Sequence, residues 1–314
     1  MDRETYWKNF SLGTELEVAG SFIYNGLWTF HEMNNFSNEA QVFEFFYNIA
    51  VGVERIAKVT IILLEHNDIT DQQEFEEELR THNHAHLIER IADHKPLHLS
   101  REHHAFIEML RVFYDSIRYG RYSLESIRSH ALELDMLVSF ISNYLEGEVD
   151  TASPFVSRNN TRIKRYVGRI IGKVCNQLYE IIDETATRLN MYTYEISYFT
   201  KAYKIFTRHE YDFIDEDLAW TELLIYLLNT DERSAFLNVL KGVEPLELDA
   251  ELIQDYIISR HSPTVRCDIL DAVDSQYEEF EDKEEMKNRL SLMQALNSPG
   301  VMFMDDDEEQ DEEV

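Results

Sequence analysis

The stretch EAQVFEFFYNIAVGVERIAKVTIILLEH, residues 39–66, decides the fold, because it is long, rich in apolar residues and free of proline. Val53, Ala57, Ile61 and Leu64 recur at intervals of three and four residues, which is the spacing of one face of an α-helix. Ser37 or Asn38 can cap the start of this helix. Most other positions are also apolar, so we predict a helix at the centre of a helical bundle.

The same periodicity extends along most of the chain and predicts further helices. In residues 14–33 it is carried by Leu16, Ala19, Phe22, Ile23, Leu27 and Phe30. Other helices are predicted over about 84–93, 101–118, 123–146, 157–189, 191–209, 216–229, 231–241, 249–259 and 263–296. Ten glycines and five prolines leave the chain few of the turns that β-hairpins need. We therefore predict an all-α protein.

One internal segment predicts a domain boundary. EGEVDTASP, residues 146–154, combines glycine, acidic and small polar residues with Pro154. We expect one domain over 1–148, a helical C-terminal domain over 149–297 and a tail over 298–314. The tail ends in DDDEEQDEEV, whose eight acids and no base predict disorder.

The chain is strongly acidic, with 60 Asp and Glu residues against 29 Lys and Arg and a net charge of −31. A protein of this charge repels polyanions at long range, which excludes non-specific binding of nucleic acid over its whole surface. A nucleic acid would need a local basic patch.

Membrane and secretory classes are not indicated. No run of 18 apolar residues exists, and the start MDRETYWKNF lacks the features of a signal peptide. The two cysteines, Cys175 and Cys267, lie in helical patterns and suit a reducing compartment better than a disulfide framework. We expect a cytoplasmic protein without a membrane partner.

A basic patch occurs in SRNNTRIKRYVGRIIGKV, residues 157–174, which carries six bases and no acid. On a continuous helix, Arg158, Arg162, Arg165 and Arg169 would lie within about 60° of one another, and Lys173 would extend the row. The apolar residues Ile163, Val167, Ile170, Val174 and Leu178 would occupy the opposite side. Because arginine forks bind phosphate oxygens, RNA, DNA or a nucleotide is one candidate partner of this row. The alternative is internal ion pairing with the many acids of the chain.

Seven of the twelve histidines fall between residues 82 and 104, three of them in RTHNHAHLIER, residues 80–90. His82 and His86 could share a helical face, whereas alternate residues such as His82 and His84 diverge by about 200°. No HExxH or CxxC pattern completes a ligand set. We favour a polar helix start over a metal site, and expect neither metal nor cofactor. A further interpretation is that several of these imidazoles titrate together near neutral pH, so that the segment responds to pH.

Four segments in order carry a family resemblance: SFIYNGL (21–27), VGVERIAKVTIILL (51–64), THNHAHLIERI (81–91) and FIEMLRVFYDSIRYGRYS (106–123). They resemble the entry helix, the charged central helix, the next helix start and the helix ending in an Arg-Tyr pair of the HEPN (higher eukaryotes and prokaryotes nucleotide-binding) family. In this comparison Glu54, Arg55 and Lys58 stand at the charged positions of the central helix. The resemblance spans residues 14–122 and implies an N-terminal antiparallel HEPN-like helical bundle with a C-terminal helical extension.

Nuclease members of that family cut RNA as dimers, with an Arg and a His separated by four to six residues. The resemblance therefore nominates Arg80 and His86 as catalytic candidates, although they lie one helix earlier than the family motif. In the expected region, Arg128-Ser129-His130 is too tight and Arg158-Asn159 has no His behind it.

Because the motif is misplaced, we favour a non-catalytic HEPN-like module that binds RNA, a nucleotide or a protein partner. We expect it to act as a homodimer in a prokaryotic defence or toxin-type system. A metal-independent endoribonuclease acting as a dimer and a purely structural interaction protein are the alternatives.

Overall fold

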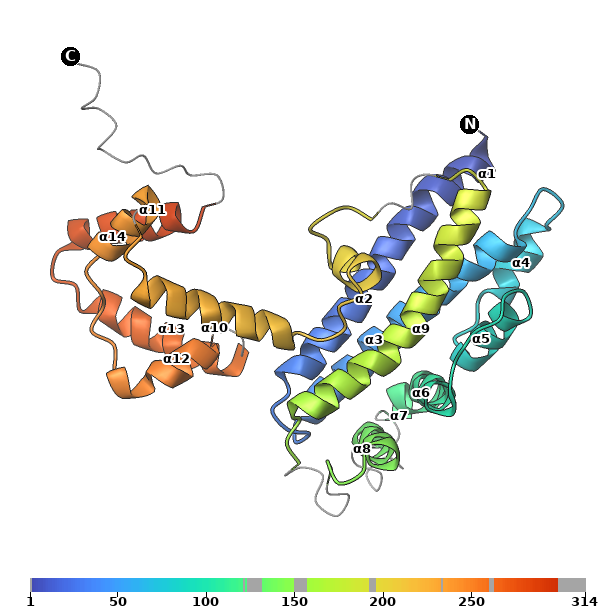
Figure 1. The fold of residues 1–314 in the computed structure, drawn as a ribbon, viewed down its shortest axis with the longest axis horizontal. Coiled ribbons are helices and arrows are strands. Elements are labelled where there is room, and N and C mark those ends of the chain that lie inside the picture. The colour runs from blue at the N-terminus through green and yellow to red at the C-terminus, as the bar shows by residue number, and fades with distance from the viewer. Residues whose placement is uncertain are drawn as a thin grey trace. The chain divides into compact units, whose positions relative to one another are not determined.

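Helix α3 (Glu39–Glu65) is the central element of the computed structural model (Figure 1). The structure describes residues 2–120, 122, 132–149, 157–191, 196–232, 234–259 and 263–298. Five helices pack against α3, namely α2 (Leu12–Glu32), α5 (His84–Ala92), α6 (Arg101–Val112), α8 (Leu132–Tyr144) and α9 (Thr161–Arg188). The predicted all-α class is confirmed.

Helices α2 and α3 form an antiparallel pair joined by residues 33–38. Gly26 lies against Ile49, and Gly52 lies against Ile23. The later residue of α2 thus faces the earlier residue of α3, as expected for antiparallel helices. Near the connection, the rings of Phe30 and Phe45 pack with centroids 4.8 Å apart. This pair forms the main layer of the core.

Side-chain caps set the starts of several helices. Asn38 accepts from the backbone N–H groups of Ala40 and Gln41, as predicted for the start of α3. Ser100 and His103 form a capping box at the start of α6. Asp71 caps helix α4 (Gln72–Glu78), which the helical pattern did not predict because this segment is almost entirely polar.

Short elements extend the main helices of the bundle. Helix α1 (Arg3–Tyr6) and a π-helical turn, η1 (Trp7–Ser11), lead into α2. After α6 the chain continues through a second π-helical turn, η2 (Phe113–Ile117), and α7 (Arg118–Gly120). None of the helices among the described residues is both long and apolar enough to span a membrane.

The chain divides into two compact units, unit 1 (Met1–Ala219) and unit 2 (Trp220–Val314). Helix α10 (Ile214–Asn229) begins in unit 1 and continues in unit 2. Unit 2 also contains α11 (Ala235–Gly242), η6 (Ala250–Leu252), α12 (Ile253–Ser259), α13 (Pro263–Glu278) and α14 (Lys283–Leu296).

This division differs from the boundary expected after residue 148. Helix α9 follows that boundary, yet it packs on α3 and belongs to unit 1. Residues 150–156 lie outside the described residues, as do residues 299–314, which include the predicted acidic tail.

Two predicted helices differ from those observed. Within the predicted helix 191–209, residues 192–195 lie outside the described residues. Among the others, helix is found only at 201–207, where it ends in the π-helical turn η5 (Tyr203–Thr207). The predicted helix 263–296 is two helices, because Asp282 caps the start of α14 by accepting from Glu284 N–H. The hydrophobic period alone does not reveal such interruptions.

The close approach at Gly52 gives a test of the packing of α2 on α3. A Cβ atom at this position would lie 2.6 Å from Ile23 Cγ1 and 3.1 Å from the backbone oxygen of Ala19. We expect Gly52→Ala to destabilise the protein by roughly 1–3 kcal/mol through overpacking, measured by urea or thermal unfolding. Gly242→Ala is the control, because nothing lies within 4 Å of its Cβ position. Equal stability of the two variants would contradict the packing.

Candidate functional site

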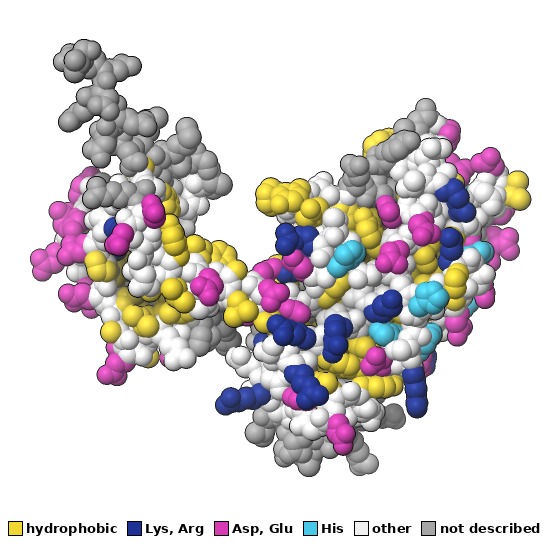
Figure 2. Space-filling model, viewed as in Figure 1, with side chains coloured by type: hydrophobic (Ala, Val, Ile, Leu, Met, Phe, Trp, Pro, Cys, Tyr) yellow, Lys and Arg dark blue, Asp and Glu magenta, His cyan; other side chains and the backbone are white. Residues whose placement is uncertain are grey.

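The basic patch predicted at 157–174 is an exposed side of helix α9. Asn160 caps the helix, and Ile163, Val167, Ile170, Val174 and Leu178 are buried, as predicted. The opposite side is exposed and carries four cations in successive turns, Arg162, Arg165, Arg169 and Lys173. We call these four side chains the cationic face. In Figure 2, Lys and Arg side chains gather on the visible face of unit 1.

Two cations of this face have acidic partners. Arg162 lies 2.5 Å from Glu148, and Arg165 lies 3.8 Å from the largely exposed Asp215. Among the described residues, Arg169 and Lys173 have no carboxylate within 4.0 Å. The internal ion pairing considered from the sequence therefore involves half of the cationic face.

Arg158 does not share this geometry, because it precedes the N-cap of α9. Its backbone forms an isolated antiparallel bridge with Asn35, and its side chain is exposed. The next residue, Asn159, is buried and donates from its amide to the backbone oxygen of Phe30 at 2.7 Å. The expected helical row thus begins at Arg162 rather than at Arg158.

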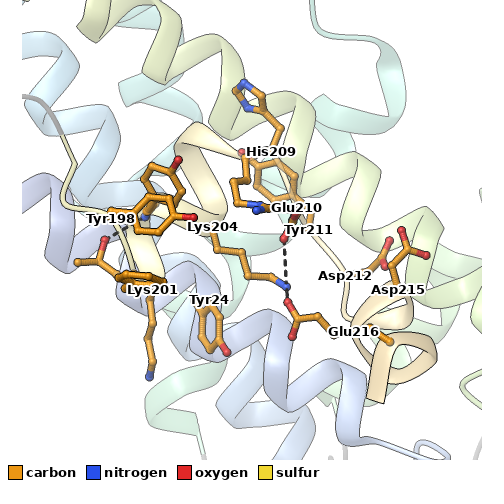
Figure 3. Close-up of a pocket in the computed structure, with 15 residues that line it drawn as sticks. Tyr24, Tyr198, Lys201, Lys204, His209, Glu210, Tyr211, Asp212, Asp215 and Glu216 are labelled. Atoms are coloured by element: carbon orange, nitrogen blue, oxygen red, sulfur yellow. Dashed lines mark hydrogen bonds and ion pairs between the residues drawn. The ribbon is translucent and has the colours of Figure 1, made fainter. Parts of the chain in front are cut away.

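A cavity of about 720 Å³ lies beside α9 and is formed mainly by residues 198–219 (Figure 3). Its wall contains five aromatic residues, Tyr24, Tyr198, Phe199, Tyr203 and Tyr211, and the cations Lys201, Lys204 and Arg208. Tyr198 packs edge-on against Tyr203, with ring centroids 4.8 Å apart. Four carboxylates also line the cavity, Glu210, Asp212, Asp215 and Glu216.

Lys204 is neutralised inside this cavity. Its ammonium group donates to Glu216, lies 3.6 Å from Glu210 and stands 4.1 Å from the centre of the Phe213 ring. Figure 3 shows Lys204 reaching toward Glu216 above Tyr24. The aromatic rings and the paired charges therefore favour a flat polar ligand over a simple anion.

Close backbone packing and hydrogen bonds hold the cavity segment against α9. At Gly168 a Cβ atom would lie 2.4 Å from the backbone oxygen of Tyr211, so only glycine lets that segment rest on α9. Tyr211 and His209 both contact the Asn176 side chain of α9, at 2.5 and 2.7 Å. His209 and Phe199 have left-handed backbone angles, with φ of 55° and 70°. Such strain in residues other than glycine is concentrated at functional sites.

Sequence reasoning missed this cavity. The hydrophobic period predicted a helix over 191–209, whereas Tyr198 and Phe199 precede the helical turn and are exposed. Neither the positive φ angles nor the contact with Tyr24 leaves a signal in the local sequence.

Arg80 and His86 are both exposed. Arg80 follows α4, and His86 lies in the first turn of α5, where its backbone N–H donates to Asn83. Within the described part of the chain, neither side chain has an ion-pair partner. Among the residues that the structure describes, no hydrogen bond or ion pair joins the side chains of Arg80 and His86 into a catalytic pair.

Several residues of the segments 51–64, 81–91 and 106–123 form a polar cluster. The buried Glu54 accepts from Lys58 at 2.6 Å and contacts His82 Nδ1 at 2.9 Å. The His82 ring packs on Tyr114, and the Arg118 guanidinium lies 3.7 Å from the centre of the same Tyr114 ring. Burial opposes ionisation of Glu54, but the hydrogen bonds of Lys58 and His82 outweigh it and hold the carboxyl pKa below its usual value.

The histidines between 82 and 104 have separate environments. His84 is buried and donates from Nε2 to the backbone oxygen of Ala50 at 2.8 Å, whereas His94 lies 3.1 Å from Glu65. His103 caps α6. In the described ranges, no three His, Cys, Asp or Glu side chains come together as potential metal ligands.

Comparisons of this chain with protein-family models, with curated proteins and with solved structures find no match.

The buried His84 predicts a pH dependence of stability. Burial lowers its pKa, and the hydrogen bond to Ala50 opposes this only in part. The unfolded chain, with a histidine pKa of about 6.5, therefore binds the proton more readily. Stability should be highest above about pH 6.5 and fall as the pH drops toward the lower pKa of the folded state.

We expect His84→Gln, which can keep the donor to Ala50 but cannot titrate, to lose less stability between pH 7.5 and 5.5 than the unchanged protein. Urea unfolding at both pH values measures this. His86→Gln is the control, because His86 is exposed. Identical pH dependence in the His84→Gln variant and the unchanged protein would disprove the role of His84.

Proposed function

We propose that this chain is a non-catalytic module that binds single-stranded RNA on the cationic face of α9. The observation that carries the proposal is the alignment of Arg162, Arg165, Arg169 and Lys173 on one exposed side of a helix, within a chain of net charge −31. Cations at helical spacing on a rigid element can contact successive phosphates, and the acidic remainder repels nucleic acid elsewhere.

The neighbouring cavity supports an unpaired strand rather than a duplex. Its aromatic rings offer surfaces on which a base can stack, and its carboxylates can accept hydrogen bonds from base amino and imino groups. The cavity is joined to α9 by two sets of contacts. Asp215 of the cavity pairs with Arg165 of α9, and His209 and Tyr211 of the cavity contact Asn176 of α9. A strand can thus place phosphates on the cationic face and one base in the cavity.

The HEPN resemblance of residues 14–122 favours RNA as the nucleic acid and a homodimer as the acting form. Within this proposal the protein acts in the cytoplasm, in a prokaryotic defence or toxin-type system. Cys175 agrees with a reducing compartment, because it is buried and burial raises the pKa of its thiol, which keeps it protonated and unreactive.

The binding surface is tested with the double variant Arg169→Gln/Lys173→Gln. We expect it to weaken binding of a labelled single-stranded RNA and to reduce the slope of log K against log salt by about 1.4, or roughly 0.7 for each lost phosphate contact. Fluorescence anisotropy at several salt concentrations measures both effects.

Arg188→Gln is the matched control, since Arg188 is an exposed cation in the last turn of the same helix. If both variants bind RNA as the unchanged protein does, the cationic face is not the binding surface.

The endoribonuclease alternative is tested separately. We expect the pure protein to leave mixed RNA intact over a range of protein concentrations, with or without EDTA. The exposed, unpaired placement of Arg80 and His86 is the reason. Cleavage that disappears in both Arg80→Ala and His86→Ala would replace the proposal with a nuclease.

A further inference from the structure

Helix α10 is apolar around its whole circumference where it lies in unit 2. From Trp220 to Leu228 only Thr221 and Glu222 are polar. At 100° per residue the other positions cover every side of the helix. Ile225 and Leu228, about 60° apart, are 49% and 75% exposed. A helix that is apolar on all sides is normally buried on all sides.

The other helices of unit 2 add to this surface. Large apolar side chains are exposed on four of them, namely Phe236, Leu240, Ile253, Ile257, Leu270 and Leu290. Among the described side chains of residues 220–298, Leu237 is the only buried hydrophobic one. Such a small core offsets little of the entropy lost when the helices become ordered. The described part of unit 2 therefore has apolar side chains that a further element could cover to complete its core.

Charge indicates what that element is. Residues 220–298 contain 17 acidic and 7 basic side chains. In the part of unit 2 that the structure describes, one ion pair is found, Lys287–Glu284 at 3.9 Å. Figure 2 shows acidic side chains beside the hydrophobic ones on unit 2. A second copy of unit 2 would bring the same excess of negative charge, and an anionic membrane or nucleic acid would also be repelled.

We propose that the apolar, acidic surface of unit 2 is a docking site for a basic amphipathic helix of a partner protein. The apolar side of such a helix buries Ile225 and Leu228 of α10, and its Lys and Arg residues face carboxylates such as Glu222. This site belongs to unit 2, whereas the cationic face of α9 belongs to unit 1 and has the opposite charge.

The test uses the full chain and a labelled 18-residue helical peptide of leucine and lysine with one apolar side. We expect it to bind the unchanged protein in a fluorescence anisotropy titration. The variant Ile225→Ser/Leu228→Ser keeps every charge, yet it should bind about tenfold or more weakly, because two apolar contacts are lost. Ile69→Ser is the matched control, since Ile69 is 93% exposed in unit 1. Circular dichroism checks that both variants stay folded.

Two further peptides separate charge from shape. A scrambled peptide of the same composition, without an apolar side, should bind less tightly, and a peptide of leucine and glutamate should not bind. Equal affinity of the unchanged protein and the α10 variant for the basic peptide would overturn the proposal, as would no binding at all. Light scattering that shows a dimer in the unchanged protein and a monomer in the α10 variant would overturn it too, because the occupant would then be a second copy.

Discussion

The close antiparallel packing of α2 on α3 is the constraint on which unit 1 depends. Gly26 and Gly52 have no side chains at the positions where Ile49 and Ile23 of the facing helix lie. The helices can therefore approach closely, and their large apolar side chains fill the space along the rest of the pair. With α3 covered on this side, its remaining sides receive α5, α6, α8 and α9.

The position of the candidate binding surface follows from this core. Helix α9 buries its apolar side on α3, which leaves Arg162, Arg165, Arg169 and Lys173 on the outside. A second close approach, of Tyr211 to Gly168, then holds the cavity segment against α9. The cations of α9 and the aromatic rings of the cavity come to lie side by side although they belong to separate segments of the chain. This juxtaposition, more than any single residue, supports the proposal of a nucleic-acid-binding module.

The two units differ in how they use apolar residues. Unit 1 buries its large side chains, among them Phe30, Phe45, Phe46, Phe106 and Phe113. Among the described side chains of unit 2, Leu237 is the one buried hydrophobic residue, and acids lie among the others. The physical consequence is that unit 1 contains its own core, whereas unit 2 would gain stability from the proposed partner helix that covers its apolar surface. The cationic face of α9 and the acidic surface of unit 2 have opposite charges. They therefore suit two different proposed partners, a phosphate backbone and a basic helix.

The sequence by itself determined the helical class, the central position of 39–66 and the apolar side of α9, because hydrophobic period and burial express the same local geometry. It also offered Asn38, with Ser37, as the cap of α3, because capping depends on neighbouring backbone groups. Only the tertiary structure decided that Arg158 leaves the row, that Glu54, Lys58, His82, Tyr114 and Arg118 meet, and that Tyr24 lines a cavity with residues 198–219. Those relations join positions far apart in the chain or depend on positive φ angles, and no local pattern encodes either.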